Sequence, residues 1–209
     1  MLNVEISTPP MFNFRLILAL PFLCGSVLSS VVGNTALPRS ANASLSPEFR
    51  PVTFVGDVAA VVTNTAGSTH IYYQNPDNSI QETITSAPFV VGAFEASTLI
   101  VPADEVLCGT PIAATTISNA FPIRVFFVSP NYILSEYAWT GTAWEGWPQC
   151  SGCITANQFA VEPGSSVLYA LAGSTAAVPL RVGFISAGQP GTLTEAEFTA
   201  DKWELLSLP

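Results

Sequence analysis

Three segments of the sequence repeat one pattern of short runs, and this repeat limits the folds that the chain can adopt. The runs are rich in Val, Ile, Thr, Phe and Tyr and are separated by Gly, Pro, Asn and Ser, which is typical of strands joined by turns. Tyr72, Phe126 and Gly183 occupy the same position in the three copies, 54 and then 57 residues apart. The runs span residues 58–63, 69–74 and 79–84, then 111–116, 123–128 and 133–138, then 166–171, 180–185 and 192–198.

A fourth run follows in the second and third copies, around residues 144–147 and 203–206. Four short antiparallel strands in a repeat of about 50 residues are typical of a propeller blade. The sequence therefore predicts an all-β fold, a partial β-propeller of about three four-stranded antiparallel blades, with an ordinary β-sandwich as the alternative. The predicted propeller half spans residues 49–209, and its repeats span 57–107, 108–163 and 164–209.

Three blades cannot close a ring, because propellers typically need four to eight. Open blade faces would expose sheet edges and apolar surface. One hypothesis is that two chains associate by two-fold symmetry and complete a six-bladed ring. Residues 49–54, which precede the first copy, could supply an outer strand to another blade.

The N-terminal region has the pattern of a secretory signal. Arg15 precedes the apolar run 16–24, and small residues follow from Gly25 to Gly33. The run is shorter than the roughly 20 residues of a membrane span. We expect residues 1–33 to be a signal peptide, with a buried N-terminal helix as the alternative, and the protein to be secreted and extracellular.

Residues 34–48 are predicted to form a flexible polar segment before the propeller half. Within it, Asn42 begins an Asn-Ala-Ser glycosylation sequon.

The composition disfavours several classes of partner. The chain has 6 Lys and Arg against 15 Asp and Glu, and it shows no basic patch. A nucleic acid, an anionic membrane or a polyanionic glycan is therefore not expected as a partner, whereas a neutral ligand suits the charge. No other segment is apolar for long enough to cross a membrane.

Removal of the signal would leave three cysteines, Cys108, Cys150 and Cys153. Export favours a disulfide, here from Cys108 to Cys150 or Cys153, and an odd count leaves one thiol free or paired with another chain. A structural zinc site usually needs four Cys or His ligands, and only Cys108 and His70 could complete one around Cys150 and Cys153. We expect neither a metal nor another cofactor.

Polar side chains recur at fixed positions in the repeat. A cation precedes a glutamate by 12 residues in the first two copies and by 14 in the third, and a tryptophan follows the glutamate by eight in the last two copies. Val90 stands at that eighth position in the first copy. The recurring residues are His70 and Glu82, then Arg124, Glu136 and Trp144, then Arg181, Glu195 and Trp203.

These residue types suit a neutral sugar. Arg offers a rigid fork of donors, Glu accepts from hydroxyl groups, and a Trp face covers the apolar side of a sugar ring. The alternative is a structural Arg–Glu pair across neighbouring strands.

The second copy resembles a blade of the fungal fucose-specific lectins. The resemblance rests on Arg-Val-Phe-Phe from Arg124, on residues 133–137 and on the tryptophans of residues 139–144, and residues 72–82 are similar to the family's second and third strands. It implies six blades in a ring, with fucose held between adjacent blades by an Arg, a Glu and aromatic side chains. By position, it implies polar pairs at Arg124 with Glu136 and at Arg181 with Glu195, a further ligand at Glu82, and pocket aromatics at Trp144, Trp203 and Trp139.

The sequence also departs from the family. His70 replaces an Arg, the turn of residues 187–191 is altered, and the chain has half the usual length. A propeller-like structural or interaction protein with degenerate sugar sites is therefore an alternative.

Catalysis is not expected. His70 is the single histidine, and the chain has neither a Gly-x-Ser-x-Gly elbow nor a His-Glu-x-x-His zinc site. A glycan-processing enzyme is a weaker alternative, because paired carboxylates can come together in space from any part of a sequence.

Overall fold

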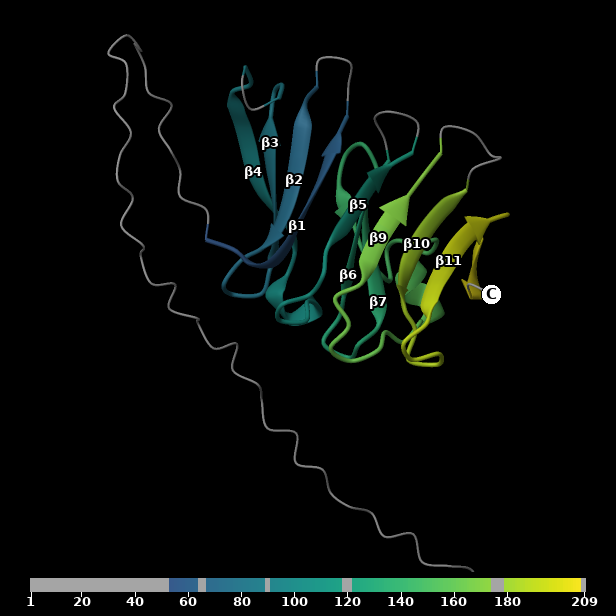
Figure 1. Cartoon of the computed structure of the whole chain (residues 1–209). Coiled ribbons are helices and arrows are strands. Elements are labelled where there is room, and N and C mark those ends of the chain that lie inside the picture. Colours follow the sequence, from purple (N-terminus) through teal and green to yellow (C-terminus); the bar gives the residue numbers. More distant parts are fainter. Residues whose placement is uncertain (1–52, 64–66, 89–90, 118–121, 174–178, 208–209) are drawn as a thin grey trace, which may run out of the picture. The chain divides into compact units, whose positions relative to one another are not determined.

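Each copy of the repeat folds into one antiparallel sheet of four strands in sequence order (Figure 1). The structure is a computed structural model that describes residues 53–63, 67–88, 91–117, 122–173 and 179–207. The predicted all-β fold with three four-stranded blades is therefore confirmed. The first sheet contains β1 (Val55–Val62), β2 (Thr69–Gln74), β3 (Ile80–Thr85) and β4 (Phe94–Val101); the second contains β5 (Ala113–Thr116), β6 (Ile123–Val128), β7 (Leu134–Trp139) and β8 (Trp144–Glu145); the third contains β9 (Leu168–Leu171), β10 (Leu180–Ile185), β11 (Leu193–Thr199) and β12 (Lys202–Ser207).

The register of the sheets agrees with the predicted repeat. Tyr72 pairs with Glu82 across β2 and β3, and Phe126 pairs with Glu136 across β6 and β7. Gly183 pairs with Glu195 across β10 and β11. The three copies are thus equivalent strand by strand.

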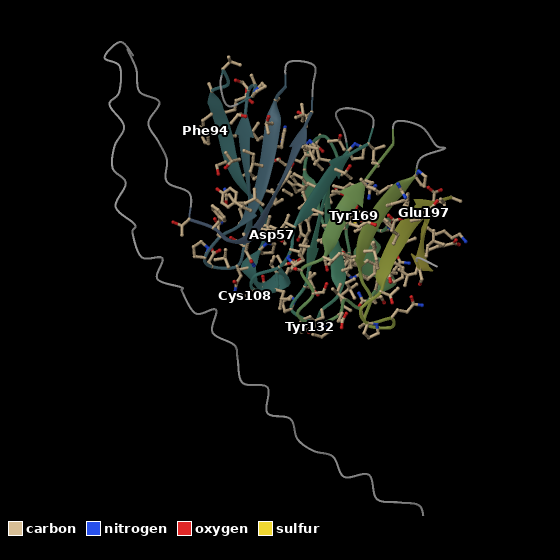
Figure 2. All side chains as sticks on the ribbon, in the orientation of Figure 1. Asp57, Phe94, Cys108, Tyr132, Tyr169 and Glu197 are labelled. Atoms are coloured by element: carbon tan, nitrogen blue, oxygen red, sulfur yellow. A yellow bond between two sulfur atoms is a disulfide. The ribbon has the colours of Figure 1, made fainter. Side chains whose placement is uncertain are left out.

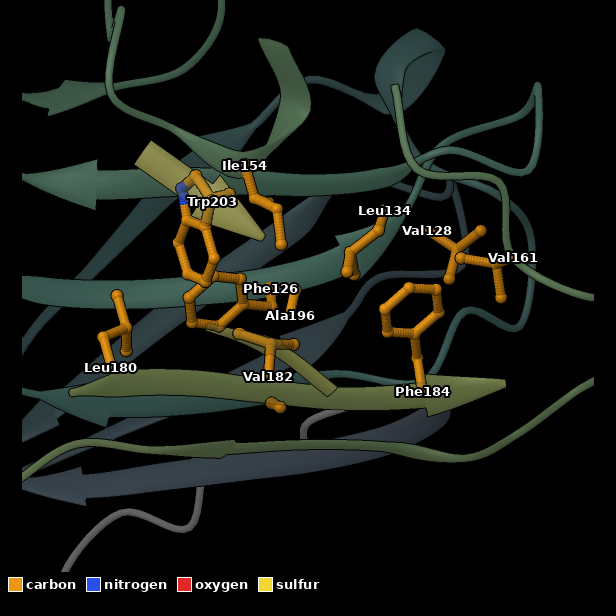
Figure 3. Close-up of a cluster of buried hydrophobic side chains, with 11 residues drawn as sticks. Phe126, Val128, Leu134, Ile154, Val161, Leu180, Val182, Phe184, Ala196 and Trp203 are labelled. Carbon is orange, nitrogen blue, oxygen red and sulfur yellow. The ribbon is translucent and has the colours of Figure 1, made fainter. Parts of the chain in front are cut away.

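Two apolar cores join the three sheets, because alternate side chains of the second sheet point to its two faces. Ile123, Val125 and Phe127 pack toward the first sheet. Phe126 and Val128 pack toward the third sheet, in the core that Figure 3 shows. The second sheet is therefore buried on both faces, and the outer faces of the other two sheets define the ends of the stack.

The first sheet also has a fourth strand, although the sequence shows a fourth run only in the second and third copies, and it begins later than the spacing of those copies would place it. β4 starts at Phe94, and Phe94 pairs with Thr85. Trp144 and Trp203 hold the equivalent position in the other two sheets. The counterpart of these tryptophans is thus Phe94 and not Val90, because the connection after β3 is longer and the ladder is irregular at Thr85.

The predicted disulfide from Cys108 to Cys150 or Cys153 is wrong. Cys150 and Cys153 bond to each other, with Cα atoms 5.3 Å apart, since a turn with a hydrogen bond from Cys153 N–H to Cys150 O brings them together. Their sulfurs are therefore not available to zinc. Cys108 (Figure 2) is also disulfide-bonded, so no described cysteine is a free thiol.

Several predictions concern residues that the structure does not describe. The signal peptide (1–33), the polar segment (34–48) and the sequon at Asn42 lie outside the described residues. Of the predicted outer strand 49–54, only Thr53 and Phe54 are described, and neither is in a strand. The described ranges contain no helix with the length and hydropathy of a membrane span.

Candidate functional site

Each sheet brings its basic side chain (His70, Arg124 or Arg181) and its glutamate together across the second and third strands. His70 Nδ1 lies 2.8 Å from Glu82 Oε1, and Arg181 lies 3.1 Å from Glu195 Oε2. Arg124 forms the equivalent ion pair with Glu136. The contact follows from the register, because the cation stands two residues before the register partner of the glutamate and therefore on the same face.

A cleft of about 220 Å³ lies between the first and second sheets, and we call it the His70 cleft. Glu82, Trp139 and Trp144, three of the predicted sugar ligands, share this cleft. His70, which was not among the predicted ligands, lies in it beside Glu82. The lining residues are His70, Glu82, Ile84 and Thr98 from the first sheet and Ile123, Trp139 and Trp144 from the second.

The polar side of the His70 cleft has acceptor atoms that no described residue donates to. Glu82 Oε1 accepts from the Tyr72 hydroxyl at 2.9 Å and from His70 Nδ1, whereas Glu82 Oε2 makes no hydrogen bond with the described residues. A carboxylate can only accept, so the proton of a neutral His70 sits on Nδ1 and leaves Nε2 as an acceptor. Burial, and then the charge of Glu82, raise the pKa of Tyr72 far above its ordinary value, so this phenol remains a donor.

The apolar side of the His70 cleft is a pair of indole rings. Trp139 and Trp144 pack at 5.7 Å between ring centroids, with their planes at 51°. Trp144 also meets Tyr72 edge to face, at 5.9 Å and 80°. Since both contacts hold Trp144 in place, the cleft combines a fixed aromatic wall with hydrogen-bonding groups, an arrangement that suits a sugar ring.

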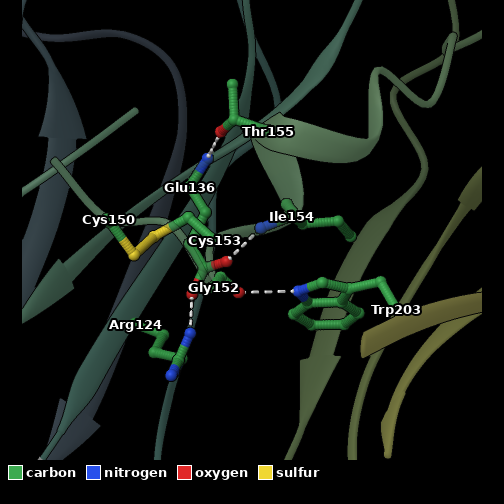
Figure 4. Close-up of a disulfide and its surroundings, with 8 residues drawn as sticks. All are labelled: Arg124, Glu136, Cys150, Gly152, Cys153, Ile154, Thr155 and Trp203. Carbon is green, nitrogen blue, oxygen red and sulfur yellow. Dashed lines mark hydrogen bonds and ion pairs between the residues drawn. A yellow bond between two sulfur atoms is a disulfide. The ribbon is translucent and has the colours of Figure 1, made fainter. Parts of the chain in front are cut away.

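The Arg124–Glu136 pair has the same register but a different environment (Figure 4). The side chain of Glu136 is fully buried, and that of Arg124 is 14% exposed. Glu136 Oε2 accepts from Ile154 N–H at 2.7 Å, so both carboxylate oxygens are bonded within the chain. Burial raises the pKa of Glu136, while the Arg124 charge and the Ile154 N–H act against this shift.

Aromatic side chains of the third sheet cover the Arg124–Glu136 pair. The Phe198 ring centroid lies 5.8 Å from the Arg124 guanidinium carbon. Trp203 meets Phe126 edge to face at 6.2 Å and 83°, and its Nε1 donates to Gly152 O at 3.0 Å. Trp203 is 5% exposed. The structure thus brings the predicted residues Arg124, Glu136 and Trp203 together, with Trp203 as part of the core.

The Arg181–Glu195 pair lies on the face of the third sheet that points away from the second. Its side chains are 34% and 17% exposed. The Tyr169 hydroxyl (Figure 2) donates to Glu195 Oε1 at 2.7 Å, and burial and this bond raise the pKa of Tyr169 to about 12. Gly183 makes room for the tyrosine, because a Cβ there would lie 2.0 Å from the Tyr169 ring.

The predicted site residues therefore occupy three equivalent places in the fold. His70, Tyr72 and Phe198 were not predicted, although the repeat carries a signal for the last two. Tyr72 is the register partner of Glu82, and Phe198 follows Glu195 by three residues as Trp139 follows Glu136.

No family model matches this chain, and no curated protein matches it. Solved structures do. The structure of AofleA from Arthrobotrys oligospora superposes with a TM-score of 0.61 and 20% identity, over 76% of this chain and 43% of that one. The Aleuria aurantia lectin, whose structure is described as a six-bladed β-propeller with a novel mode of fucose recognition, superposes with a TM-score of 0.58 and 22% identity, over 76% of this chain and 51% of that one.

The chain has the fold of half a lectin propeller. It spans about half the length of these structural neighbours, and the predicted resemblance to the fungal fucose-specific lectins is confirmed for the fold. Another structure of the Aleuria aurantia lectin is a complex with α-methyl-L-fucoside.

Proposed function

We propose that this chain is a non-catalytic carbohydrate-binding protein that binds a neutral sugar, fucose before others, in the His70 cleft. The observation that carries the proposal is the composition of this cleft, which joins His70 and Glu82 from one blade to Trp139 and Trp144 from the next. The fucose complex of a protein with the same fold and the acidic composition of this chain support it.

The chemistry of the cleft follows from the two acceptor atoms, Glu82 Oε2 and His70 Nε2, that have no donor among the described residues. A sugar hydroxyl can donate to Glu82 Oε2, and a second hydroxyl can donate to the neutral His70 at Nε2. The indole of Trp144 can cover a methyl group or the C–H face of the ring. A charged acceptor strengthens the first of these bonds, so Glu82 is expected to contribute most of the polar affinity.

Titration calorimetry with L-fucose, D-galactose and D-mannose tests this proposal. We expect L-fucose to bind most tightly, and Glu82→Gln and Trp144→Ala each to weaken binding. Glu204→Gln is the matched control, because Glu204 is exposed on β12 and pairs with Lys202. Equal loss in the control, or no binding of any neutral sugar, would contradict the proposal and favour an interaction protein with degenerate sites. Turnover of a chromogenic glycoside would favour the enzyme instead.

We further propose that two chains associate so that the first sheet of one covers the Arg181–Glu195 pair of the other. The supporting observation is the position of Phe94, which stands in the register of Trp144 and Trp203 on the outer face of the first sheet and is 48% exposed. The mass in solution tests this proposal. A dimer that Arg181→Ala weakens is expected, and a monomer at all concentrations would overturn it.

The roles of Arg124, Glu136 and Trp203 as sugar ligands stay predictions. The side chain of Glu136 has no exposed surface, and both of its oxygens already accept bonds within the chain. The bond from the Ile154 N–H to Glu136 Oε2, which has no equivalent at Glu82 among the described residues, is the specific observation that favours a structural role for this pair.

We also propose that the protein is secreted. The pattern of residues 1–33 and the disulfide between Cys150 and Cys153 support an oxidising destination. Sequencing the N-terminus of the mature protein tests this, and a start near Asn34 is expected. Retention of residues 1–33 in the mature protein would contradict it.

A further inference from the structure

A second cleft, of about 290 Å³, lies on the second sheet and shares no lining residue with the His70 cleft. It borders the 3-10 helix η1 (Ala103–Glu105), the turn that carries Tyr132 (Figure 2) and the loop that leads to the 3-10 helix η2 (Ile154–Asn157). We call it the acidic cleft. No proposed sugar ligand of the His70 cleft takes part in it.

Two carboxylates of η1 line the acidic cleft. The Tyr137 hydroxyl donates to Glu105 Oε2 at 3.0 Å. Burial raises the pKa of the Tyr137 hydroxyl, and the charges of Glu105 and Asp104 raise it further. Asp104 is exposed and makes no hydrogen bond or ion pair with the described residues.

The charge of these carboxylates is not neutralised within the described part of the chain. Three Lys and Arg side chains occur there, and each pairs with a glutamate other than Glu105. One of these glutamates, Glu136, also lines the cleft, but its side chain is fully buried. The pairs are Arg124 with Glu136, Arg181 with Glu195, and Lys202 with Glu204. The acidic cleft therefore presents negative charge that a bound cation would offset.

The rest of the lining includes aromatic and polar side chains, together with Pro130 and Ile133. Trp147 is 49% exposed at the rim, and Phe127, 1% exposed, closes the base. An exposed indole beside carboxylates favours an organic cation over a metal ion, because it adds a cation–π contact and an apolar surface. Asn131 and Gln158 add amide groups.

We propose that the acidic cleft binds an amino sugar in its protonated form, a glucosamine-type ring. The ammonium group pairs with Asp104 and Glu105, and the ring lies against Trp147. The amides of Asn131 and Gln158 form hydrogen bonds with the hydroxyl groups of the ring, and a simple alkylammonium ion has no such hydroxyl groups. The volume is at the lower end of the range for small-molecule sites, roughly 300 Å³, which fits a single ring.

The test is calorimetry of the full chain at roughly pH 6, where a primary amine is protonated. The probes are D-glucosamine, N-acetyl-D-glucosamine, D-glucose and propylammonium chloride. We expect glucosamine to bind at least roughly tenfold more tightly than the other three, because only it joins a charged donor to a ring of hydroxyls. Binding that is as tight for glucose or for the N-acetyl sugar would overturn the role of the amine, and equally tight propylammonium binding would overturn the sugar.

Variants locate the binding. Asp104→Asn and Trp147→Ala are expected to weaken glucosamine binding several-fold, and both side chains are exposed, so these variants should keep the fold. Glu204→Gln serves as the control for loss of a surface charge. Undiminished binding in both Asp104→Asn and Trp147→Ala would overturn the assignment of the ligand to this cleft.

Discussion

The His70 cleft and the junction around Arg124 are built on one register, but they differ in what they leave for a ligand. Their aromatic frames are nearly the same, since Tyr72 meets Trp144 at 5.9 Å and 80° and Phe126 meets Trp203 at 6.2 Å and 83°. Glu82 keeps one oxygen without a partner among the described residues, whereas both oxygens of Glu136 are bonded.

The difference comes from the segment after β8. There the chain forms the Cys150–Cys153 disulfide and enters η2, whose Ile154 N–H bonds to Glu136. In the described part of the first sheet, Glu82 receives no such bond. The comparison shows that the acceptor left unbonded, more than the identity of the cation, separates a candidate binding site from a structural ion pair.

The largest expected effect distinguishes the two tryptophans. Trp203→Ala should lower the free energy of unfolding by about 3–5 kcal/mol, because it removes a buried indole from the core. Trp144→Ala should lower it less, since Trp144 is only partly buried. Urea unfolding followed by fluorescence measures both. Equal losses would contradict the distinction between the cleft and the core.

Arg124→Ala should destabilise the protein by about 3–5 kcal/mol, because it leaves Glu136 buried without its charge partner. Burial already raises the pKa of Glu136, and the variant should raise it further. A pKa that is higher in the folded state favours folding at low pH, so the stability of the variant should fall as pH rises above the ordinary glutamate range. Unfolding curves across pH measure this. His70→Ala is the control. A similar loss of stability and a similar pH dependence in His70→Ala would contradict the difference between the His70 cleft and the Arg124–Glu136 pair.

Replacement of Cys150 and Cys153 by serine tests the segment that encloses Glu136. Because the disulfide closes only a short loop, its loss should lower the free energy of unfolding by about 2 kcal/mol. It should also speed hydrogen exchange at the Ile154 amide, because η2 is no longer held next to the turn. Unchanged exchange at Ile154 would show that the disulfide does not hold this bond.

The smallest expected effect concerns the residue at position 70 in the His70 cleft. His70→Arg should tighten fucose binding about fivefold, because a hydrogen bond from a charged donor is stronger than one to a neutral imidazole by roughly 1 kcal/mol. Calorimetry of the variant and of Glu204→Gln measures the change. Weaker binding would mean that the sugar needs the Nε2 acceptor of His70.

The repeat predicted the strands and the pairing of the sheets because register is a local property of alternating side chains. Tyr72, Phe126 and Gly183 already align in the sequence, and the ladders place them opposite the three glutamates. The alignment did not identify Phe94 as the counterpart of Trp144, since the connection after the third strand is longer in the first copy than in the second.

The ranking of the candidate sites could not be read from the repeat. Arg124 and Arg181 fit the family pattern better than His70, but the access to each glutamate depends on contacts from outside its own strand pair. Among the described residues, Glu136 alone of the three glutamates accepts from a backbone N–H, that of Ile154, which follows the turn between Cys150 and Cys153. The same segment explains why the predicted disulfide from Cys108 was wrong, because the local turn brings Cys150 and Cys153 close in space.

The first and third sheets place a tyrosine hydroxyl on the equivalent glutamate from two different strands. In the first sheet the hydroxyl reaches the glutamate from the second strand, at Tyr72, and in the third sheet it comes from β9. A designer could therefore move a tyrosine from one strand to its neighbour, provided that glycine fills the vacated position. Such a transfer would keep the carboxylate's hydrogen bond, and it would restrict the second-strand position to glycine.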